Sequence, residues 1–488
     1  MRPHLVALAC LGSGALLGAA LTPVPSTEAA APTAPGARAA DPSAWEPLSA
    51  AGPGQPGPSQ RVDLTRSPDG ILHIAWAVRN ADGTSSLKER RLTPIGPGGD
   101  DLMSTVSTPI SSWLMVGDPA GVDIGDGYQL YLGGQQSADP DTLDGLVGVS
   151  NVGPNADPAW SAPLMMEPGE AAMWAQVAQA PSQTPVFVFE HNSMVVADRP
   201  DATPPAAVPA SGGNVGAGSI VIDPTNSAHA VVAWCEFGGS EPGTHEQVYD
   251  TGTGAFLGSP TLMPGTADAC VLQATINRGT PLALRGNDAY VGGTHLNAST
   301  GVLTDVRVWQ VGDATAEVVG RSRTGVSAPQ VTTDSCGRIW VAWLARRDGT
   351  HTLLARRSNE AATEWGATVA VEPPAGWSLG SFEAIASCVR GPGQLDVVGQ
   401  FEKPGKNVLQ RTVVRPGLSL AVVHVEKLGD GSKRVTYLAT DAGRPVVGAR
   451  VHAHGVSAFT GTDGKVTLRF TGDTSATVTG LGYSDGQT

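Results

Sequence analysis

The sequence predicts an all-β protein, in which a β-propeller precedes a small β-sandwich. The first observation is a strand motif that returns about every 54 residues, most clearly as Ile74-Ala75-Trp76, Val232-Ala233-Trp234 and Val341-Ala342-Trp343. The first two of these Trp residues are 158 residues apart and the last two are 109 apart, close to three periods and two periods. The second is that Gly and Pro make up 100 of the 488 residues, so turns are dense. The third is a change of pattern after Pro416.

Each period is expected to supply one blade of the propeller. Other β-rich runs stand where the motif is absent: Gln129–Leu132, Val186–Phe189, Ala289–Val291 and Leu395–Val398. A further strand follows each of these runs, and four strands in about 54 residues are typical of a propeller blade. We therefore expect about seven blades over residues 60–416. A count of six stays open if the short third unit, near residues 175–200, is not a complete blade. The repeated Trp residues are expected to pack between blades rather than against a ligand.

The N-terminus has the pattern of a secretory signal peptide. Arg2 precedes an apolar run from Leu5 to Leu21, which is short and rich in Ala and Gly. Cleavage after Ala29 and cleavage after Ala39 both stay open. Residues 1–39 are thus interpreted as signal peptide and leader, and residues 40–59, rich in Pro, Gly and Ala, as a linker. No later segment is apolar enough to span a bilayer, so the sequence predicts a secreted protein without a membrane span.

Four cysteines remain after Cys10 is removed with the signal peptide. An even number in an exported protein suggests two disulfides, and four cysteines allow three pairings. Cys336 and Cys388 are 52 residues apart, nearly one period, so they occupy matching places in adjacent blades. Cys235 follows the Trp of one repeat and Cys270 opens the next. The prediction is Cys235–Cys270 and Cys336–Cys388.

The charge of the chain bears on its partners. The formal net charge is −14 and only 16% of the residues are charged. A net negative charge repels anionic polymers at long range, which argues against nucleic acid as a partner.

Residues 418–488 are expected to form the sandwich. Alternating strands are separated by the turns Gly429-Asp430-Gly431 and Thr462-Asp463-Gly464, which are typical of β-hairpins. The segment Gly443–Val451, the second of these turns and Gly482-Tyr483 together resemble the carboxypeptidase regulatory-like (transthyretin-like) sandwich family. The resemblance covers about 70 residues. It implies an accessory module rather than a peptidase.

The propeller half resembles the sialidase-like superfamily in its repeats that end in Ala-Trp and in the return segment Asp157–Pro163, which contains Trp-Ser-Ala-Pro. The resemblance implies a catalytic site of three Arg residues, a Tyr activated by Glu, and an Asp acid/base. Two features depart from it. Arg61 is followed by Val-Asp rather than Ile-Pro, and Asn80–Gly83 lacks the Trp of a complete Asp box.

The catalytic nominees under this resemblance are Tyr249 and Glu246, because Tyr249 is the Tyr with the nearest acidic neighbours. Sialidase chemistry would also require three Arg side chains to converge, for which Arg285, Arg307 and Arg346 are candidates. Their convergence with a Tyr–Glu pair at the central depression would separate a hydrolase from a binding protein.

The cofactor expectation is none, apart from a candidate calcium site. Asp139, Asp141 and Asp144 place three carboxylates within six residues before a Gly, and hard oxygen ligands in such a turn can surround Ca²⁺.

Together these features predict a secreted, non-catalytic binding or scaffold protein that uses a propeller face to bind a glycan or a protein. The alternative is an exo-glycoside hydrolase of sialidase type.

Overall fold

This computed structural model describes residues 45–49, 62–67, 70–95, 99–102, 106–123, 127–139, 144–152, 160–168, 175–179, 184–191, 194–198, 206–266, 270, 279–347, 349–388 and 391–488. The expected signal peptide lies outside these ranges. Within them the structure is all-β, as predicted, and contains no helix of the length and apolarity needed to cross a bilayer.

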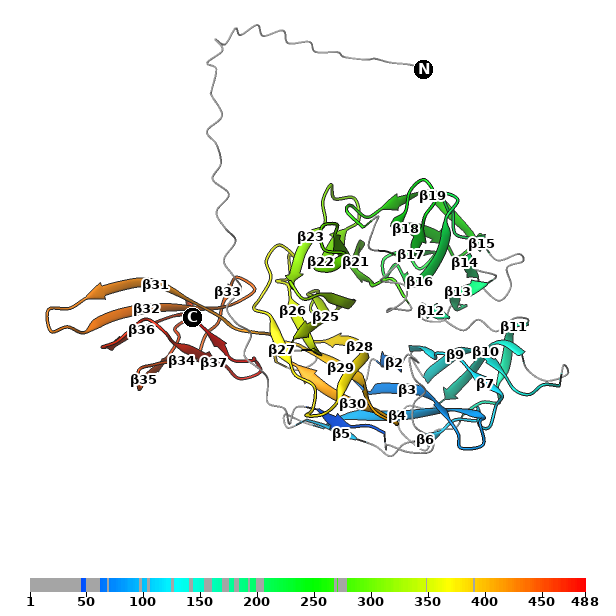
Figure 1. Ribbon diagram of the computed structural model, residues 1–488, viewed down its shortest axis with the longest axis horizontal. Coiled ribbons are helices and arrows are strands. Elements are labelled where there is room, and N and C mark those ends of the chain that lie inside the picture. The colour runs from blue at the N-terminus through cyan, green and yellow to red at the C-terminus, as the bar shows by residue number, and fades with distance from the viewer. Residues whose placement is uncertain are drawn as a thin grey trace, which may run out of the picture. The chain divides into compact units, whose positions relative to one another are not determined.

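The propeller half consists of seven sheets within the described ranges (Figure 1). The first contains β2 (Val62–Arg66), β3 (Leu72–Arg79), β4 (Ser85–Ile95), β5 (Gly99–Leu102) and β6 (Val106–Ser107). The second contains β7 (Met115–Val116), β8 (Ala120–Asp123), β9 (Gly127–Gln135), β10 (Asp144–Val152) and β11 (Leu164–Pro168). The third contains β12 (Gln176–Ala178), β13 (Val186–His191), β14 (Met194–Asp198) and β15 (Ala206–Ala207). The fourth contains β16 (Asn214–Ile222), β17 (His229–Phe237), β18 (Gly243–Asp250) and β19 (Ala255–Leu262).

The remaining three sheets follow the same order of antiparallel strands. The fifth contains β20 (Leu282–Arg285), β21 (Asp288–Asn297), β22 (Val302–Gln310) and β23 (Glu317–Arg321). The sixth contains β24 (Val326–Thr333), β25 (Ile339–Arg347), β26 (Thr350–Arg357) and β27 (Val369–Val371). The seventh contains β28 (Ser378–Ser387), β29 (Gln394–Lys403), β30 (Lys406–Val414) and β1 (Glu46–Pro47).

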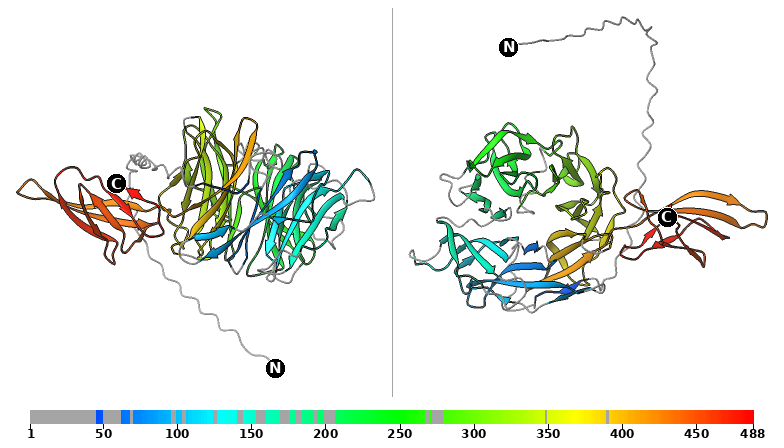
Figure 2. Two further views of the ribbon diagram at one scale, coloured as in Figure 1. Left: turned by 90° about the horizontal axis from the view of Figure 1, so that it is seen from below. Right: turned by 180° about the vertical axis from the view of Figure 1, so that it is seen from behind.

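The seven sheets close into a ring. Their first strands contact one another in the order β2, β8, β12, β16, β20, β24 and β28, and β28 contacts β2 again. Figure 2 shows the sheets around a common centre in its right-hand view. Because each sheet is covered by its neighbours on both faces, the ring buries both sides of its strands.

The N-terminal strand β1 closes the last sheet and corrects the expectation of a linker over residues 40–59. Glu46 pairs with Arg411 and Pro47 with Gln410 of β30. Trp45 is buried, lies edge-on to Phe401 with ring centroids 4.7 Å apart, and donates its indole N–H to the carbonyl of Glu372 at 2.9 Å. The fourth strand of the seventh sheet thus comes from the other end of the propeller sequence. A Pro is tolerated there because an edge strand has one side without a partner.

The repeated Trp residues pack between sheets, as predicted. Trp76 belongs to a buried cluster with Val398 and Leu409 of the seventh sheet. Trp234 joins Val186 and Val188 of the third sheet. Trp343 is likewise buried against strands of the fifth sheet. The 54-residue period therefore arises because each blade places a Trp or another large side chain at the same position, where it packs against the neighbouring blade.

The C-terminal residues form a two-sheet sandwich, as predicted. One sheet contains β31 (Ser419–Lys427), β32 (Lys433–Asp441), β33 (Arg444–Pro445) and β36 (Lys465–Phe470). The other contains β34 (Arg450–Ala453), β35 (Val456–Phe459), β37 (Thr477–Thr479) and β38 (Gly486–Gln487). Burial alternates strictly along β36, and a shared core includes Tyr437, Leu468 and Val478. One face of each sheet is thus apolar and packs against the other sheet.

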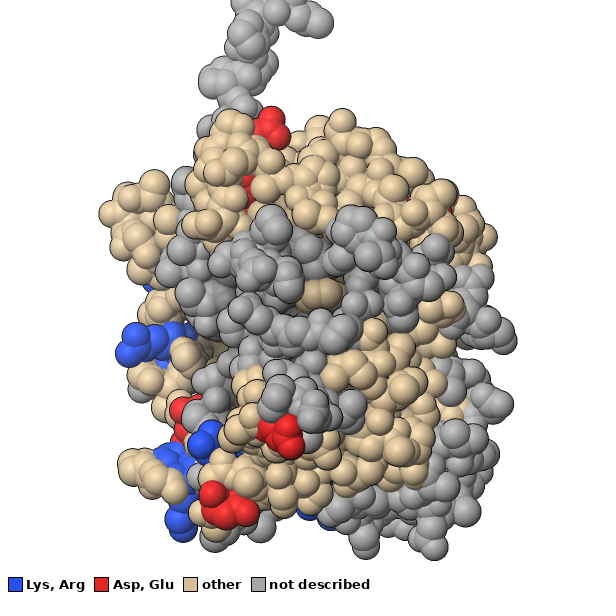
Figure 3. Space-filling model, turned by 90° about the vertical axis from the view of Figure 1, so that its right-hand side faces the viewer, with Lys and Arg blue, Asp and Glu red and all other residues tan. Residues whose placement is uncertain are grey.

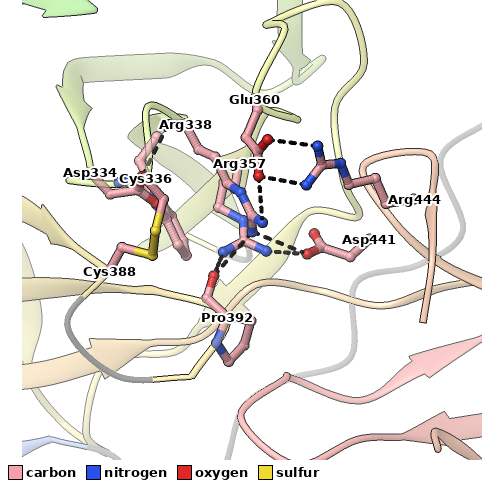
Figure 4. Close-up of a disulfide and its surroundings, with 10 residues drawn as sticks. Asp334, Cys336, Arg338, Arg357, Glu360, Cys388, Pro392, Asp441 and Arg444 are labelled. Carbon is pink, nitrogen blue, oxygen red and sulfur yellow. Dashed lines mark hydrogen bonds and ion pairs between the residues drawn. A yellow bond between two sulfur atoms is a disulfide. The ribbon is translucent and has the colours of Figure 1, made fainter. Parts of the chain in front are cut away.

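Ion pairs join the sandwich to the sixth sheet of the propeller (Figure 4). The buried Arg357 guanidinium donates to the Asp441 carboxylate and to the carbonyl of Pro392. Arg444 donates to both oxygens of Glu360, at 2.5 and 2.7 Å. Asp441 and Arg444 flank the turn that begins the segment with the carboxypeptidase regulatory-like pattern, so that turn contacts the propeller directly.

Candidate functional site

The two catalytic nominees do not form a pair. Glu246 and Tyr249 both lie on β18, where Glu246 is opposite Ala233 and Tyr249 opposite Ala230 of β17. Successive side chains of a strand point to opposite faces, so two residues three positions apart lie on different faces of the sheet. Tyr249 is completely buried in the cluster of Trp234, with its ring 5.3 Å from that of Phe256. Burial raises the pKa of the Glu246 carboxyl to about 7.

Tyr290, a further Tyr of the propeller with polar neighbours, is also held inside a sheet. Its hydroxyl accepts from Arg285 at 3.0 Å and donates to Gln310 at 2.9 Å. Burial raises the pKa of Tyr290, so the phenol is kept protonated rather than activated as a nucleophile.

The three candidate arginines serve separate local contacts. Arg285 ends β20, the first strand of its sheet, whereas Arg346 lies near the end of β25, a second strand. First and second strands run antiparallel, so these two positions are on opposite faces of the ring. Arg307 of β22 lies beside Asp305, with a nitrogen to oxygen distance of 3.6 Å. The carboxylate clamp expected of a sialidase is not formed by these residues.

The first strands of the ring enclose a small polar cavity. Its volume is about 130 Å³ and its lining includes Asp63, Gln176 and Glu383. Asp63 accepts hydrogen bonds from the Gly121 amide (2.7 Å), the Tyr128 hydroxyl (2.7 Å) and the Thr65 hydroxyl (3.0 Å). Burial raises the pKa of Asp63 despite these hydrogen bonds.

These contacts give the central carboxylates a structural task. Asp63 belongs to the first sheet and two of its donors to the second, and Gly121 must lack a side chain because a Cβ there would lie 2.2 Å from Asp63 Oδ2. Glu383 of the seventh sheet similarly accepts from the Gln330 amide of the sixth at 3.1 Å. Ligand pockets usually exceed about 300 Å³. The central cavity therefore suits ordered water better than a sugar.

A second and larger hollow lies where loops of the sixth and seventh sheets meet, and we call it the rim cavity. Its volume is about 790 Å³. The lining comes from the first residue of β26 (Thr350), the start of β28 and the two residues before it (Gly376–Ser378), and the tip of the hairpin between β29 and β30 (Glu402–Asn407). All three lie on the ring face that carries the turns between second and third strands, because β28 begins at that face.

Trp377 is the main apolar surface of the rim cavity. One part of its side chain packs against the buried cluster that includes Trp45 and Phe401, which fixes the indole in place. The Lys403 ammonium lies 4.0 Å from the centroid of the Trp377 ring. A fixed indole with a cation above it and polar groups around it resembles the usual lining of a ligand site, mostly apolar with a few polar groups.

Trp377 is not among the predicted site residues, because it does not stand at the periodic Trp position. It follows Pro373-Pro374-Ala375-Gly376, a turn-rich connection rather than a strand. Two features of the sequence could have indicated this site. One is an indole in a loop ahead of a blade's first strand, and the other is a Lys-Pro-Gly-Lys turn one hairpin later.

The candidate calcium site falls partly outside the described residues. Asp141 is not described, nor is the side chain of Asp144. The backbone amide of Asp139 donates to the Ser137 hydroxyl at 3.1 Å. The calcium site stays a prediction.

Both predicted disulfides are present. Cys235 is bonded to Cys270 and Cys336 to Cys388, each with Cα atoms 5.7 Å apart. Asp334 lies beside the second disulfide and accepts from the Cys336 amide (3.0 Å) and the Trp340 indole (3.1 Å). The Cys336–Cys388 disulfide links the turn before β25 to the end of β28, and so connects the sixth sheet to the seventh.

On the face drawn in Figure 3, a few acidic and basic side chains lie among uncharged ones in the part of the chain that the structure describes. This agrees with the low charged content of the sequence.

Comparisons with known proteins show a fold likeness only. No protein-family model and no curated protein matches the chain. A solved polysaccharide lyase matches with a TM-score of 0.44 and 9% identity, over 73% of this chain and 90% of that one. A puromycin-hydrolysing peptidase from Mycobacterium tuberculosis matches with a TM-score of 0.42 and 13% identity, over 79% and 61%. A Trypanosoma rangeli sialidase in complex with an inhibitor matches with a TM-score of 0.41 and 10% identity, over 92% and 89%.

Proposed function

We propose that this protein is an exported, non-catalytic binding protein whose rim cavity holds a saccharide. The observation that carries the proposal is the fixed Trp377 indole in a cavity of about 790 Å³. The flat apolar face of a sugar ring stacks on such an indole, while hydroxyls find partners in groups such as Asn407 and Ser378. Two disulfides support export, because such bonds persist in oxidising compartments.

The rest of the chain has a supporting role in this proposal. The ring of sheets holds the three loops of the cavity rigidly, which reduces the entropy lost when a ligand binds. The sandwich acts as an accessory module, as its resemblance to the carboxypeptidase regulatory-like family implies. No contact among the described residues favours hydrolysis of the sialidase type. The two catalytic nominees, Tyr249 and Glu246, lie on opposite faces of one sheet.

The proposal is tested by saccharide binding. The purified protein is screened on an array of oligosaccharides, and the affinity of each hit is measured by calorimetry for wild type, Trp377→Ala and Trp160→Ala. Trp160 is a matched control, a partly buried Trp that precedes β11 and packs against the core of the first two sheets, and it does not line the rim cavity.

We expect Trp377→Ala to weaken binding by at least ten-fold and Trp160→Ala to leave it unchanged, with melting curves showing that both variants are folded. Binding of protein ligands but of no saccharide would reject the saccharide in favour of a protein partner. Saccharide binding that both variants retain would place the site elsewhere.

A further inference from the structure

The hairpin at the edge of the rim cavity places two positive charges opposite each other. Lys403 and Lys406 are the last paired residues of β29 and β30, on either side of the two-residue turn Pro404-Gly405. Like charges directly opposite each other on antiparallel strands repel and are destabilising. The turn itself needs only a residue that tolerates a positive φ, which Gly405 provides with φ of 72°. The fold does not require lysine at either side.

Neither lysine is neutralised within the described residues. No carboxylate lies within ion-pair distance of Lys403 or Lys406, and the one contact of a lysine ammonium here is that of Lys403 with the Trp377 ring. Glu402, the residue before Lys403, is exposed and also lines the rim cavity, but it forms no ion pair with either lysine within the described residues. The chain has 45 acidic residues and a net charge of −14. Two lysines without an ion-pair partner at one cavity therefore run against the acidic character of the chain.

We propose that the rim cavity selects an anionic saccharide, one whose sugar ring carries a carboxylate or a sulfate. This inference rests on the proposed function, since it specifies the ligand of the same cavity. The sugar ring stacks on Trp377, and the anionic group lies between the two ammonium groups. The ligand then supplies the counter-charge that the hairpin lacks.

Lys403 has a particular part in this scheme. Without ligand its ammonium lies over the indole, 4.0 Å from the ring centroid, in a weak contact between two partly buried side chains. An anionic sugar draws the ammonium toward the carboxylate or sulfate, and this uncovers the ring for stacking. A neutral sugar must displace the same ammonium without offering it a partner, so the arrangement also discriminates against neutral ligands.

The test compares oligosaccharides of equal length that differ in charge. Titrations use a neutral galacto-oligosaccharide, an oligogalacturonide and a sulfated galacto-oligosaccharide, with wild type, the double variant Lys403→Gln/Lys406→Gln, and Lys433→Gln. Lys433 is a matched control, because its ammonium lies over the Phe470 ring at 5.7 Å on the sandwich, away from the cavity.

We expect an acidic ligand to bind at least ten-fold more tightly than the neutral one at low salt. The double variant should reduce that preference to less than two-fold, 0.5 M NaCl should weaken acidic binding, and Lys433→Gln should change neither. The oligogalacturonide and sulfated arms identify which anionic group is preferred.

Two outcomes would contradict the inference in distinguishable ways. Equal affinity for neutral and acidic ligands, with both lost in Trp377→Ala, would reject charge selection and leave saccharide binding standing. Acidic binding that survives Trp377→Ala but is lost in the double lysine variant would show general charge attraction, and would reject stacking in the cavity together with the proposed function.

Discussion

Replacing Asp441 with Ala should destabilise the contact between the propeller and the sandwich. The Arg357 side chain is 1% exposed and that of Asp441 6%, so the variant leaves a buried guanidinium without its carboxylate. Breaking such a pair by removing one partner typically costs about 3–5 kcal/mol. Arg357 keeps its hydrogen bond to the Pro392 carbonyl and its position 5.4 Å from the Trp340 ring centroid. We therefore expect a loss near the lower end, about 3 kcal/mol.

The assay is urea unfolding followed by tryptophan fluorescence, together with limited proteolysis of the connection between β30 and β31. Two controls bracket the result. Glu360→Gln removes a pair with Arg444 whose side chains are 45% and 52% exposed, and should leave the free energy of unfolding close to that of wild type. Arg357→Met combined with Asp441→Leu removes both charges, and should be closer to wild type than Asp441→Ala.

The reasoning would be refuted by an Asp441→Ala variant that unfolds within about 1 kcal/mol of wild type and is cleaved at the same rate. That result would mean that water reaches the Arg357 guanidinium in the folded protein. An equal loss in Asp441→Ala and in the double apolar variant would instead assign the effect to lost packing.

Four further outcomes are expected. Burial raises the pKa of Glu246 to about 7, above its value in the unfolded chain. The free energy of unfolding should therefore fall by about 3 kcal/mol as the pH rises from about 4.5 to 7. Glu246→Gln should remove this pH dependence in urea unfolding measured across the same range. Trp45→Ala should lower the free energy of unfolding by about 3–5 kcal/mol, because it empties a buried site on the seventh sheet; a loss under 1 kcal/mol would mean that β1 is dispensable. A fluorogenic sialoside should not be cleaved at acidic or neutral pH, and turnover that vanishes in Tyr249→Phe would restore the hydrolase reading. Calcium should raise the melting temperature, and Asp139→Asn should abolish the rise if the acidic turn is a metal site.

Periodicity made most of the fold predictable. A Trp that recurs at the spacing of a blade must meet the same environment each time, and Trp76, Trp234 and Trp343 are all buried between sheets. The disulfide Cys336–Cys388 followed from the same spacing, because residues one period apart lie side by side in adjacent blades.

The strand β1 could not be predicted in this way. It is two residues long and contains a Pro, so it shows neither alternation nor β propensity. Its partner β30 lies more than 360 residues away in the sequence, and only the closure of the ring brings the two together. The residues expected to be a linker thus include one that fills a core position, Trp45.

The nominee pair failed for a reason that the sequence already contained. Glu246 and Tyr249 were chosen for closeness along the chain, but a strand alternates with a period of two, so an odd separation puts them on opposite faces. In a strand, only residues an even number of positions apart share a face, so closeness along the chain alone does not bring two side chains together.

The rim cavity shows the complementary rule. An aromatic residue at the periodic position is explained by packing against the next blade. Off the period, Trp113, Trp309 and Trp340 are also buried, whereas Trp377 is only partly buried. Trp377 stands in a connection between blades, and its side chain meets the core on one part and the cavity on another. The two lysines of the neighbouring hairpin end its ladder, but neither forms an ion pair within the described residues. Residues that the repeat does not account for are therefore the ones to test first for ligand binding, and here three of them surround one cavity.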